Sequence, residues 1–121
     1  MKILGIDDNA DITEMLDTVL NSAGHEFSFV NKGREGLEKI KQEIFDVVLL
    51  DLSMPNFTGV DVVNALNEEG IINKQKIVLF TASSMTETEI EKLIDEGVHS
   101  CIRKPVDIPD LLEKLSELEN S

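Results

Sequence analysis

The sequence has very little of what an exported or membrane-bound protein would need. Cysteine occurs once, at Cys101, so no disulfide can form within the chain, which favours a reducing compartment. The apolar amino-terminal stretch stops at Asp7 and Asp8, far too early for the core of a signal peptide. No apolar run approaches the ~20 residues of a membrane-spanning helix. We therefore expect a soluble cytoplasmic protein without membrane contact.

Basic residues are also scarce. The chain has 11 Lys and Arg residues against 24 Asp and Glu residues, which gives a formal net charge of -13. Such a charge repels the phosphates of nucleic acids and the headgroups of anionic lipids, so direct nucleic-acid binding is not expected. The charge instead favours cations and basic protein surfaces as partners.

The length of the chain fits one domain. At 121 residues it could bury roughly two thirds of the surface that its unfolded form exposes, which is enough for a hydrophobic core. It contains no internal repeat, no low-complexity segment and no linker-like stretch. We expect residues 1–121 to form a single domain.

Short apolar segments alternate with segments in which apolar residues recur at helical spacing. Strands are expected over 2–6, 26–30, 47–50, 76–80 and 98–102. Capping boxes predict two helix starts, at Thr58 with Asp61 and at Thr86 with Glu89. This alternation predicts a doubly wound α/β fold with a five-stranded parallel sheet and helices on both faces. We expect the flavodoxin-like strand order 2-1-3-4-5.

Polar side chains follow four of these strands, where the carboxyl ends of parallel strands meet at one edge of the sheet. Asp7 and Asp8 end the first strand and Asp51 ends the third, so three carboxylates would crowd one crevice if these strands are neighbours. Such hard oxygen ligands suit Mg²⁺. Thr81 adds a hydroxyl and Lys104 a positive charge, which together with a cation would bind a doubly charged anion such as a phosphoryl group.

These residues, in their order and spacing, resemble the CheY-like receiver domain of two-component response regulators over essentially the whole chain. The motifs that carry the resemblance are Asp7-Asp8, the run from Leu49 to Gly59 around Asp51, Thr81-Ala82 and Lys104-Pro105. The resemblance implies that Asp51 is the phosphoacceptor, which takes a phosphoryl group from a histidine of a sensor kinase. It also implies a phosphorelay signalling role with no enzymatic turnover of an external substrate.

The resemblance further implies a Mg²⁺ cofactor and its ligands. Asp8, Asp51 and the backbone carbonyl of Ser53 would coordinate the ion, and Asp7 would act mainly through a bound water. Ser53 and Ser83 occupy the two positions that in the family tune hydrolysis of the phosphoryl group.

The remaining implied roles concern the phosphoryl group and the switch. Thr81, the amide of Ala82 and Lys104 would hold phosphoryl oxygens, and Pro105 would follow a cis peptide bond that aims the lysine into the site. Many receivers carry an aromatic relay residue three positions before the lysine. This chain has Cys101 there, which departs from the family pattern.

The leading prediction is a stand-alone response regulator whose phosphorylation switches a protein-interaction surface, with no output domain in the chain. Its expected partners are a sensor histidine kinase or histidine phosphotransfer protein and an unidentified downstream protein, and phosphorylation could also produce a homodimer.

Two alternatives stay open. One is a phosphatase of the haloacid-dehalogenase type, although its nucleophile would follow the first strand in an Asp-x-Asp pattern, where this chain has adjacent Asp7 and Asp8. The other is an adaptor that works without phosphorylation, against which the intact acidic set and Lys104 argue.

Overall fold

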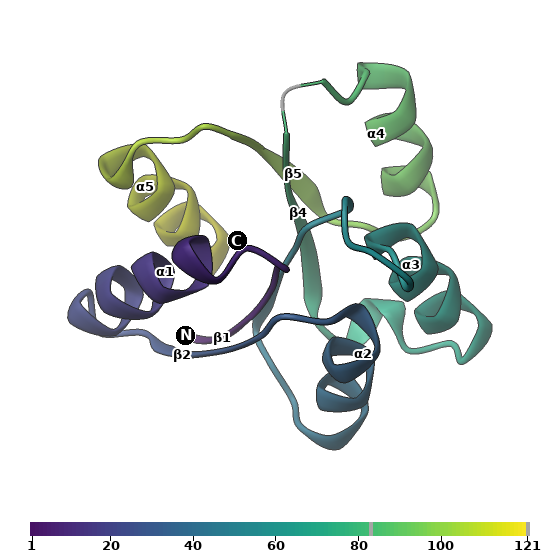
Figure 1. Ribbon diagram of the computed structural model, residues 1–121, viewed down its shortest axis with the longest axis horizontal. Coiled ribbons are helices and arrows are strands. Elements are labelled where there is room, and N and C mark those ends of the chain that lie inside the picture. Colours follow the sequence, from purple (N-terminus) through teal and green to yellow (C-terminus); the bar gives the residue numbers. More distant parts are fainter. Residues whose placement is uncertain (83, 121) are drawn as a thin grey trace.

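The protein folds as strands alternating with helices. The computed structural model describes residues 1–82 and 84–120 (Figure 1). The elements, in chain order, are β1 (Lys2–Ile6), α1 (Ala10–Ser22), β2 (Glu26–Val30), α2 (Gly33–Gln42), β3 (Val47–Leu50), α3 (Gly59–Glu68), the short 3₁₀ helix η1 (Ile72–Lys74), β4 (Lys76–Ala82), α4 (Glu87–Asp95), β5 (Ser100–Lys104) and α5 (Ile108–Glu119). Within the described residues, no helix is long and apolar enough to cross a bilayer.

The strands form one parallel sheet in the order β2-β1-β3-β4-β5. Helices α1 and α5 cover one face, and α2, α3 and α4 cover the other (Figure 1). The predicted doubly wound fold and its strand order are therefore confirmed. This order makes β1 and β3 neighbours, with Ile6 opposite Leu50 at the end of the pair.

The interior of the sheet explains the uninterrupted apolar strands in the sequence. In β3, Val47 and Leu49 face the core shared with α1 and α5, whereas Val48 and Leu50 face the core shared with α2, α3 and α4. All four residues are buried. Because successive side chains of a strand point to opposite faces, a strand covered on both faces needs apolar residues at every position.

The helix starts agree with the capping signals in the sequence. Thr58 with Asp61 opens α3 and Thr86 with Glu89 opens α4, and both capping boxes are fully formed. The side chain of Asn9 accepts hydrogen bonds from the first turn of α1. These side chains pair backbone N–H groups that have no partner within the helix.

The last strand differs from the sequence expectation, since β5 covers Ser100–Lys104 rather than 98–102. Val98 belongs to the turn that closes α4, where its N–H donates to the carbonyl of Leu93 at 3.1 Å. Gly97 precedes it with φ of 116°, the left-handed conformation that typically ends a helix. The strand consequently starts later and reaches Lys104.

Four apolar residues that recur at helical spacing in the sequence are exposed rather than buried. Ile44 is 81 % exposed because it follows the end of α2, and Ile108 is 43 % exposed at the first position of α5. Met15 in α1 and Ile94 in α4 are the other two. Asp107 takes the N-cap position of α5, but its side chain forms no capping hydrogen bond.

The connection from β3 to α3 packs closely against the strand end that carries Asp51. The N–H of Gly59 donates to the carbonyl of Leu52 at 3.2 Å. A Cβ atom on Gly59 would lie 2.7 Å from the Cα of Leu52 and closer still to the carbonyl oxygen of Asp51. Both neighbours are backbone atoms, so neither can move aside without shifting the loop.

We therefore expect Gly59→Ala to lower the free energy of unfolding by about 2 kcal/mol, measured by urea denaturation, because the added methyl group overpacks this contact. Asn64→Ala, on the exposed side of the same helix, is the control and should change stability by less than about 0.5 kcal/mol. Wild-type stability in Gly59→Ala would contradict the close approach.

Candidate functional site

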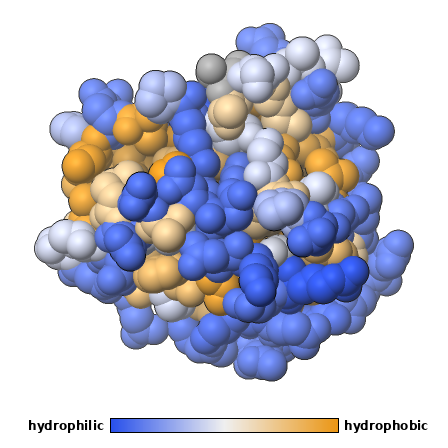
Figure 2. Space-filling view, in the orientation of Figure 1, coloured by the Kyte–Doolittle hydropathy of each residue, from blue (hydrophilic) through white to orange (hydrophobic). Residues whose placement is uncertain are grey.

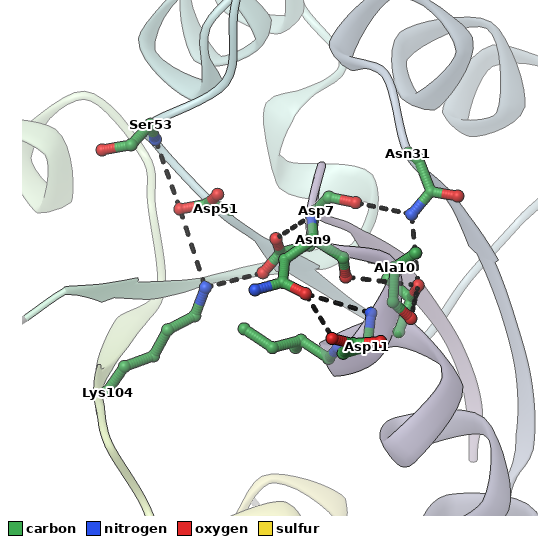
Figure 3. Close-up of polar contacts among 10 residues, drawn as sticks. Asp7, Asn9, Ala10, Asp11, Asn31, Asp51, Ser53 and Lys104 are labelled. Carbon is green, nitrogen blue, oxygen red and sulfur yellow. Dashed lines mark hydrogen bonds and ion pairs between the residues drawn. The ribbon is translucent and has the colours of Figure 1, made fainter.

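Three carboxylates meet at the carboxyl edge of the sheet. Asp7, Asp8 and Asp51 each offer an oxygen, and these oxygens all lie within 4.8 Å of one another. The pairing of β1 with β3 produces this cluster, because the N–H of Asp51 donates to the carbonyl of Ile6 at 2.9 Å and so continues the sheet register. The structure thus brings together the three acidic residues that the sequence placed at neighbouring strand ends. Figure 3 shows Asp7 and Asp51 of this cluster.

Lys104 reaches the same cluster from the end of β5. Its Nζ lies 2.7 Å from Oδ2 of Asp7 and 3.9 Å from Oδ1 of Asp51. The ammonium group also lies 5.1 Å from the centre of the Phe80 ring. The peptide bond between Lys104 and Pro105 is cis. A fixed positive charge therefore faces two of the three carboxylates (Figure 3).

Asp51 is almost fully buried, at 5 % exposure. Burial raises the pKa of its carboxyl group above the ordinary value, and the nearby negative charges of Asp7 and Asp8 raise it further. Lys104 and a 3.2 Å hydrogen bond from the N–H of Ser53 act in the opposite direction. The repulsion within the cluster is therefore only partly relieved by the protein itself.

The two adjacent aspartates differ in their surroundings. Asp7 is buried, and both of its oxygens are engaged: Oδ1 accepts from the N–H of Asn9 at 2.9 Å, and Oδ2 accepts from Lys104. Asp8 is exposed. An exposed carboxylate can take an ion from solvent at a lower desolvation cost than a buried one, so Asp8 is the more accessible ligand.

The other predicted site residues lie along the same edge. Thr81 is buried near the end of β4, and Ala82 is exposed and opposite Lys104 in the β4–β5 pair. Ser53 is exposed in the loop after β3. Ser83 lies outside the described residues.

A groove of about 500 Å³ adjoins this edge, lined by Ile12, Met15, Phe80, Ala82, Lys104, Pro105 and Val106. Figure 2 shows hydrophilic residues over much of the face viewed, with apolar residues on the side where Figure 1 places α1 and α5 and further apolar patches on the side of α3 and α4. The groove therefore offers apolar contacts next to the ammonium group of Lys104.

Cys101 is half-buried in β5 and packs against the core under α2, α3 and α4. Burial raises the pKa of its thiol, so the group stays protonated and unreactive at neutral pH. Two positions further along β5, Arg103 donates to the backbone carbonyl of Met85 at 2.6 Å, which ties the strand to the segment before α4.

The sequence reasoning missed Asn31, which follows β2 at the same edge. Its side-chain amide donates to the backbone carbonyl of Asp7 at 2.8 Å and to the hydroxyl of Thr13 at 3.1 Å. The signal was available, because Asn31 is the polar residue directly after a strand, as Asp7 and Asp51 are.

The family model of the response regulator receiver domain matches residues 3–116. The transcriptional regulatory protein DltR of Streptococcus agalactiae is 30% identical over 115 residues, which cover 95% of this chain and 50% of DltR. The response regulator ArlR of Staphylococcus saprophyticus is 29% identical over 114 residues, which cover 94% of this chain and 50% of ArlR. The chain thus spans about half the length of these curated relatives.

Solved structures agree with this likeness. The chemotaxis protein CheY4 of Vibrio cholerae superposes with a TM-score of 0.86 at 27% identity and covers 97% of both chains. The response regulator TrrA of Thermotoga maritima, solved in complex with Mg²⁺ and BeF, gives a TM-score of 0.79 at 27% identity and covers 97% of both chains.

The crowded cluster predicts a pH-dependent gain in stability for Asp51→Asn in Mg²⁺-free buffer. Because the folded protein raises the pKa of Asp51, ionising this group costs more free energy in the folded than in the unfolded state. Removing the charge should therefore increase the free energy of unfolding at pH 7. The gain should shrink as the pH falls toward 3.8, the ordinary value, because protonation then progressively removes the charge of Asp51 in both the folded and the unfolded state.

Urea denaturation at several pH values measures this gain. Glu68→Gln, which removes an exposed carboxylate from α3, is the control and should give no comparable gain. A loss of stability at pH 7 in Asp51→Asn would contradict the description of a crowded, repulsive cluster.

Proposed function

The chain belongs to the response regulator receiver domain family, and on that premise we propose that it is a phosphoacceptor switch centred on Asp51. Receiver domains of this family are signalling domains that interact with histidine kinases. The donor would be a phosphohistidine of a sensor kinase or of a histidine phosphotransfer protein. The observation that carries the proposal is the buried Asp51 carboxylate within a cluster of three, with the ammonium group of Lys104 3.9 Å from its oxygen.

The cluster fits Mg²⁺. It offers several carboxylate oxygens at close range. Burial raises the pKa of Asp51, the negative charges of Asp7 and Asp8 add to this effect, and a cation would balance those charges. We propose that Asp8, Asp51 and the backbone carbonyl of Ser53 hold the ion directly, whereas Asp7, already paired with Lys104, acts through a water. When bound, Mg²⁺ would neutralise negative charge on Asp51 and on the incoming phosphoryl group.

Asp51 would attack the phosphorus through a carboxylate oxygen. A new O–P bond forms, the P–N bond to the donor histidine breaks, and the imidazole nitrogen keeps the electron pair of that bond and takes up a proton. An ionised carboxylate needs no general base, so the protein mainly places the reactants in line and balances charge. Lys104 is near enough to pair with a phosphoryl oxygen on Asp51.

Thr81 and the amide of Ala82 would hold a second phosphoryl oxygen and so bias the segment after β4 between two arrangements. Ser53 and Ser83 would tune the hydrolysis of the acyl phosphate. With Cys101 at the relay position, an aromatic rotamer cannot carry the change along β5. We propose that the domain acts in the cytoplasm and passes its signal to another protein by direct contact.

The phosphatase alternative is less well supported by the geometry. Its nucleophile would be the first aspartate after β1, but Asp7 is buried and engaged through both oxygens. Asp51 is the better candidate nucleophile, because Lys104 lies 3.9 Å from its carboxylate and forms its short ion pair with Asp7 instead.

Incubation with Mg²⁺ and a small phosphodonor such as phosphoramidate tests the proposal. We expect a mass gain of one phosphoryl group, located at Asp51 by peptide mapping and absent from Asp51→Asn. A gain that persists in Asp51→Asn would contradict the assignment. Continuous turnover of an external phosphate ester would favour the phosphatase.

The two adjacent aspartates should differ in a Mg²⁺ titration followed by amide chemical shifts. Asp8→Ala should raise the dissociation constant for Mg²⁺ by about tenfold or more, because it removes a direct ligand. Asp7→Ala should have a smaller effect, since Asp7 is held by Asn9 and Lys104. Equal losses would show that the ligand roles are assigned wrongly.

A further inference from the structure

The loop between β1 and α1 carries Asp7 and Asp8 and is called the acidic loop below. One side chain from the end of β2 forms a hydrogen bond to this loop. The amide nitrogen of Asn31 donates to the carbonyl oxygen of Asp7 at 2.8 Å (Figure 3). It also donates to the hydroxyl of Thr13 at 3.1 Å. A backbone carbonyl can only accept hydrogen bonds, so the NH₂ end of Asn31 must face it. The contact therefore specifies an amide donor at this position.

The carbonyl that Asn31 holds belongs to the peptide unit between Asp7 and Asp8. This unit is planar, so fixing its oxygen restricts the orientation of the whole plane, from whose two Cα atoms the site carboxylates extend. On the other side of Asp7, its N–H donates to the carbonyl of Val30 at 3.3 Å. Val30 and Asn31 at the end of β2 thus form hydrogen bonds with both the N–H and the carbonyl of Asp7.

Thr13 anchors the other half of this contact. Its side chain is fully buried in α1, at 0 % exposure, and its hydroxyl donates to the carbonyl of Ala10 at 3.1 Å while it accepts from Asn31. Buried polar groups that satisfy one another are costly to separate. The two hydrogen bonds donated by Asn31, called the Asn31 clamp below, therefore connect the end of β2, the acidic loop and the first turn of α1.

We propose that Asn31 is a positioning residue that raises the Mg²⁺ affinity of the site by holding the Asp7–Asp8 peptide unit against the mutual repulsion of the three carboxylates. Asp7 and Asp51 are buried among other groups, but Asp8 is exposed and depends on its backbone for its place in the cluster. Without the clamp, the loop would relax outward, and binding the ion would have to restore its position. This inference rests on the proposed function, because it concerns the same metal site.

Asn21 is a matched control. It also links α1 to β2, since its Oδ1 accepts from the N–H of Phe27 at 3.2 Å and its amide donates to the carbonyl of Asp17 at 2.8 Å. It lies near the carboxyl end of α1, far along the helix from the acidic loop. Asn21→Ala therefore loses contacts of the same kind without touching the site.

The test is a Mg²⁺ titration of wild type, Asn31→Ala and Asn21→Ala by amide chemical shifts, with urea denaturation of each in EDTA. We expect both variants to lose stability, but only Asn31→Ala to raise the Mg²⁺ dissociation constant, by about tenfold. Asn31→Ser, whose shorter side chain cannot reach the Asp7 carbonyl, takes the place of Asn31→Ala if that variant does not fold.

A wild-type dissociation constant in the Asn31 variant, or an equal rise in Asn21→Ala, would overturn the inference. Failure of the proposed function looks different, because wild type would then neither bind Mg²⁺ nor become phosphorylated at Asp51. If wild type does both and the Asn31 variant binds Mg²⁺ as tightly, only the role of Asn31 is wrong.

Discussion

The site depends on the repulsion among three carboxylates that the sheet forces together. The pairing of β1 with β3 brings Asp7 and Asp51 side by side, and the adjacent Asp8 joins them from the acidic loop. Burial strengthens this repulsion and raises the pKa of Asp51. Lys104 offsets only part of it, since its short contact is with Asp7. A bound cation would relieve the remaining repulsion, as the proposed metal-dependent phosphoacceptor would need.

The surrounding structure resists this repulsion. Both faces of β3 are packed into hydrophobic cores, and this packing restricts any movement of Asp51 away from the other two carboxylates. Gly59 lets α3 begin directly against the same strand end, and Asn31 holds the acidic loop from the side of β2. The rigidity of these supports, rather than the acidic residues alone, would make the site respond to a bound ion or phosphoryl group instead of simply spreading apart.

The fold was predictable because the central strands, which are covered on both faces, are mainly apolar runs, as in 47–50. The helix starts at Thr58 and Thr86 were also predictable, because a capping box joins two residues only three positions apart in the sequence. The meeting of Asp7, Asp8 and Asp51 followed from the strand order. Which carboxylate Lys104 contacts most closely could not be predicted, because it depends on side-chain distances of a few ångströms. The later start of β5 could not be predicted either. Val98 is apolar and so fits a strand, but its N–H forms the hydrogen bond that ends α4, and the apolar pattern does not distinguish these two roles.

The central claim is that this cluster requires a cation, and the dependence of stability on Mg²⁺ tests it most directly. An ion that binds only the folded protein increases the free energy of unfolding as its concentration rises above the dissociation constant. We predict such an increase for wild type and its loss in Asp51→Asn, with unfolding followed in urea at constant ionic strength. Stability that does not change with Mg²⁺ in wild type, or that rises equally in Asp51→Asn, would contradict the claim.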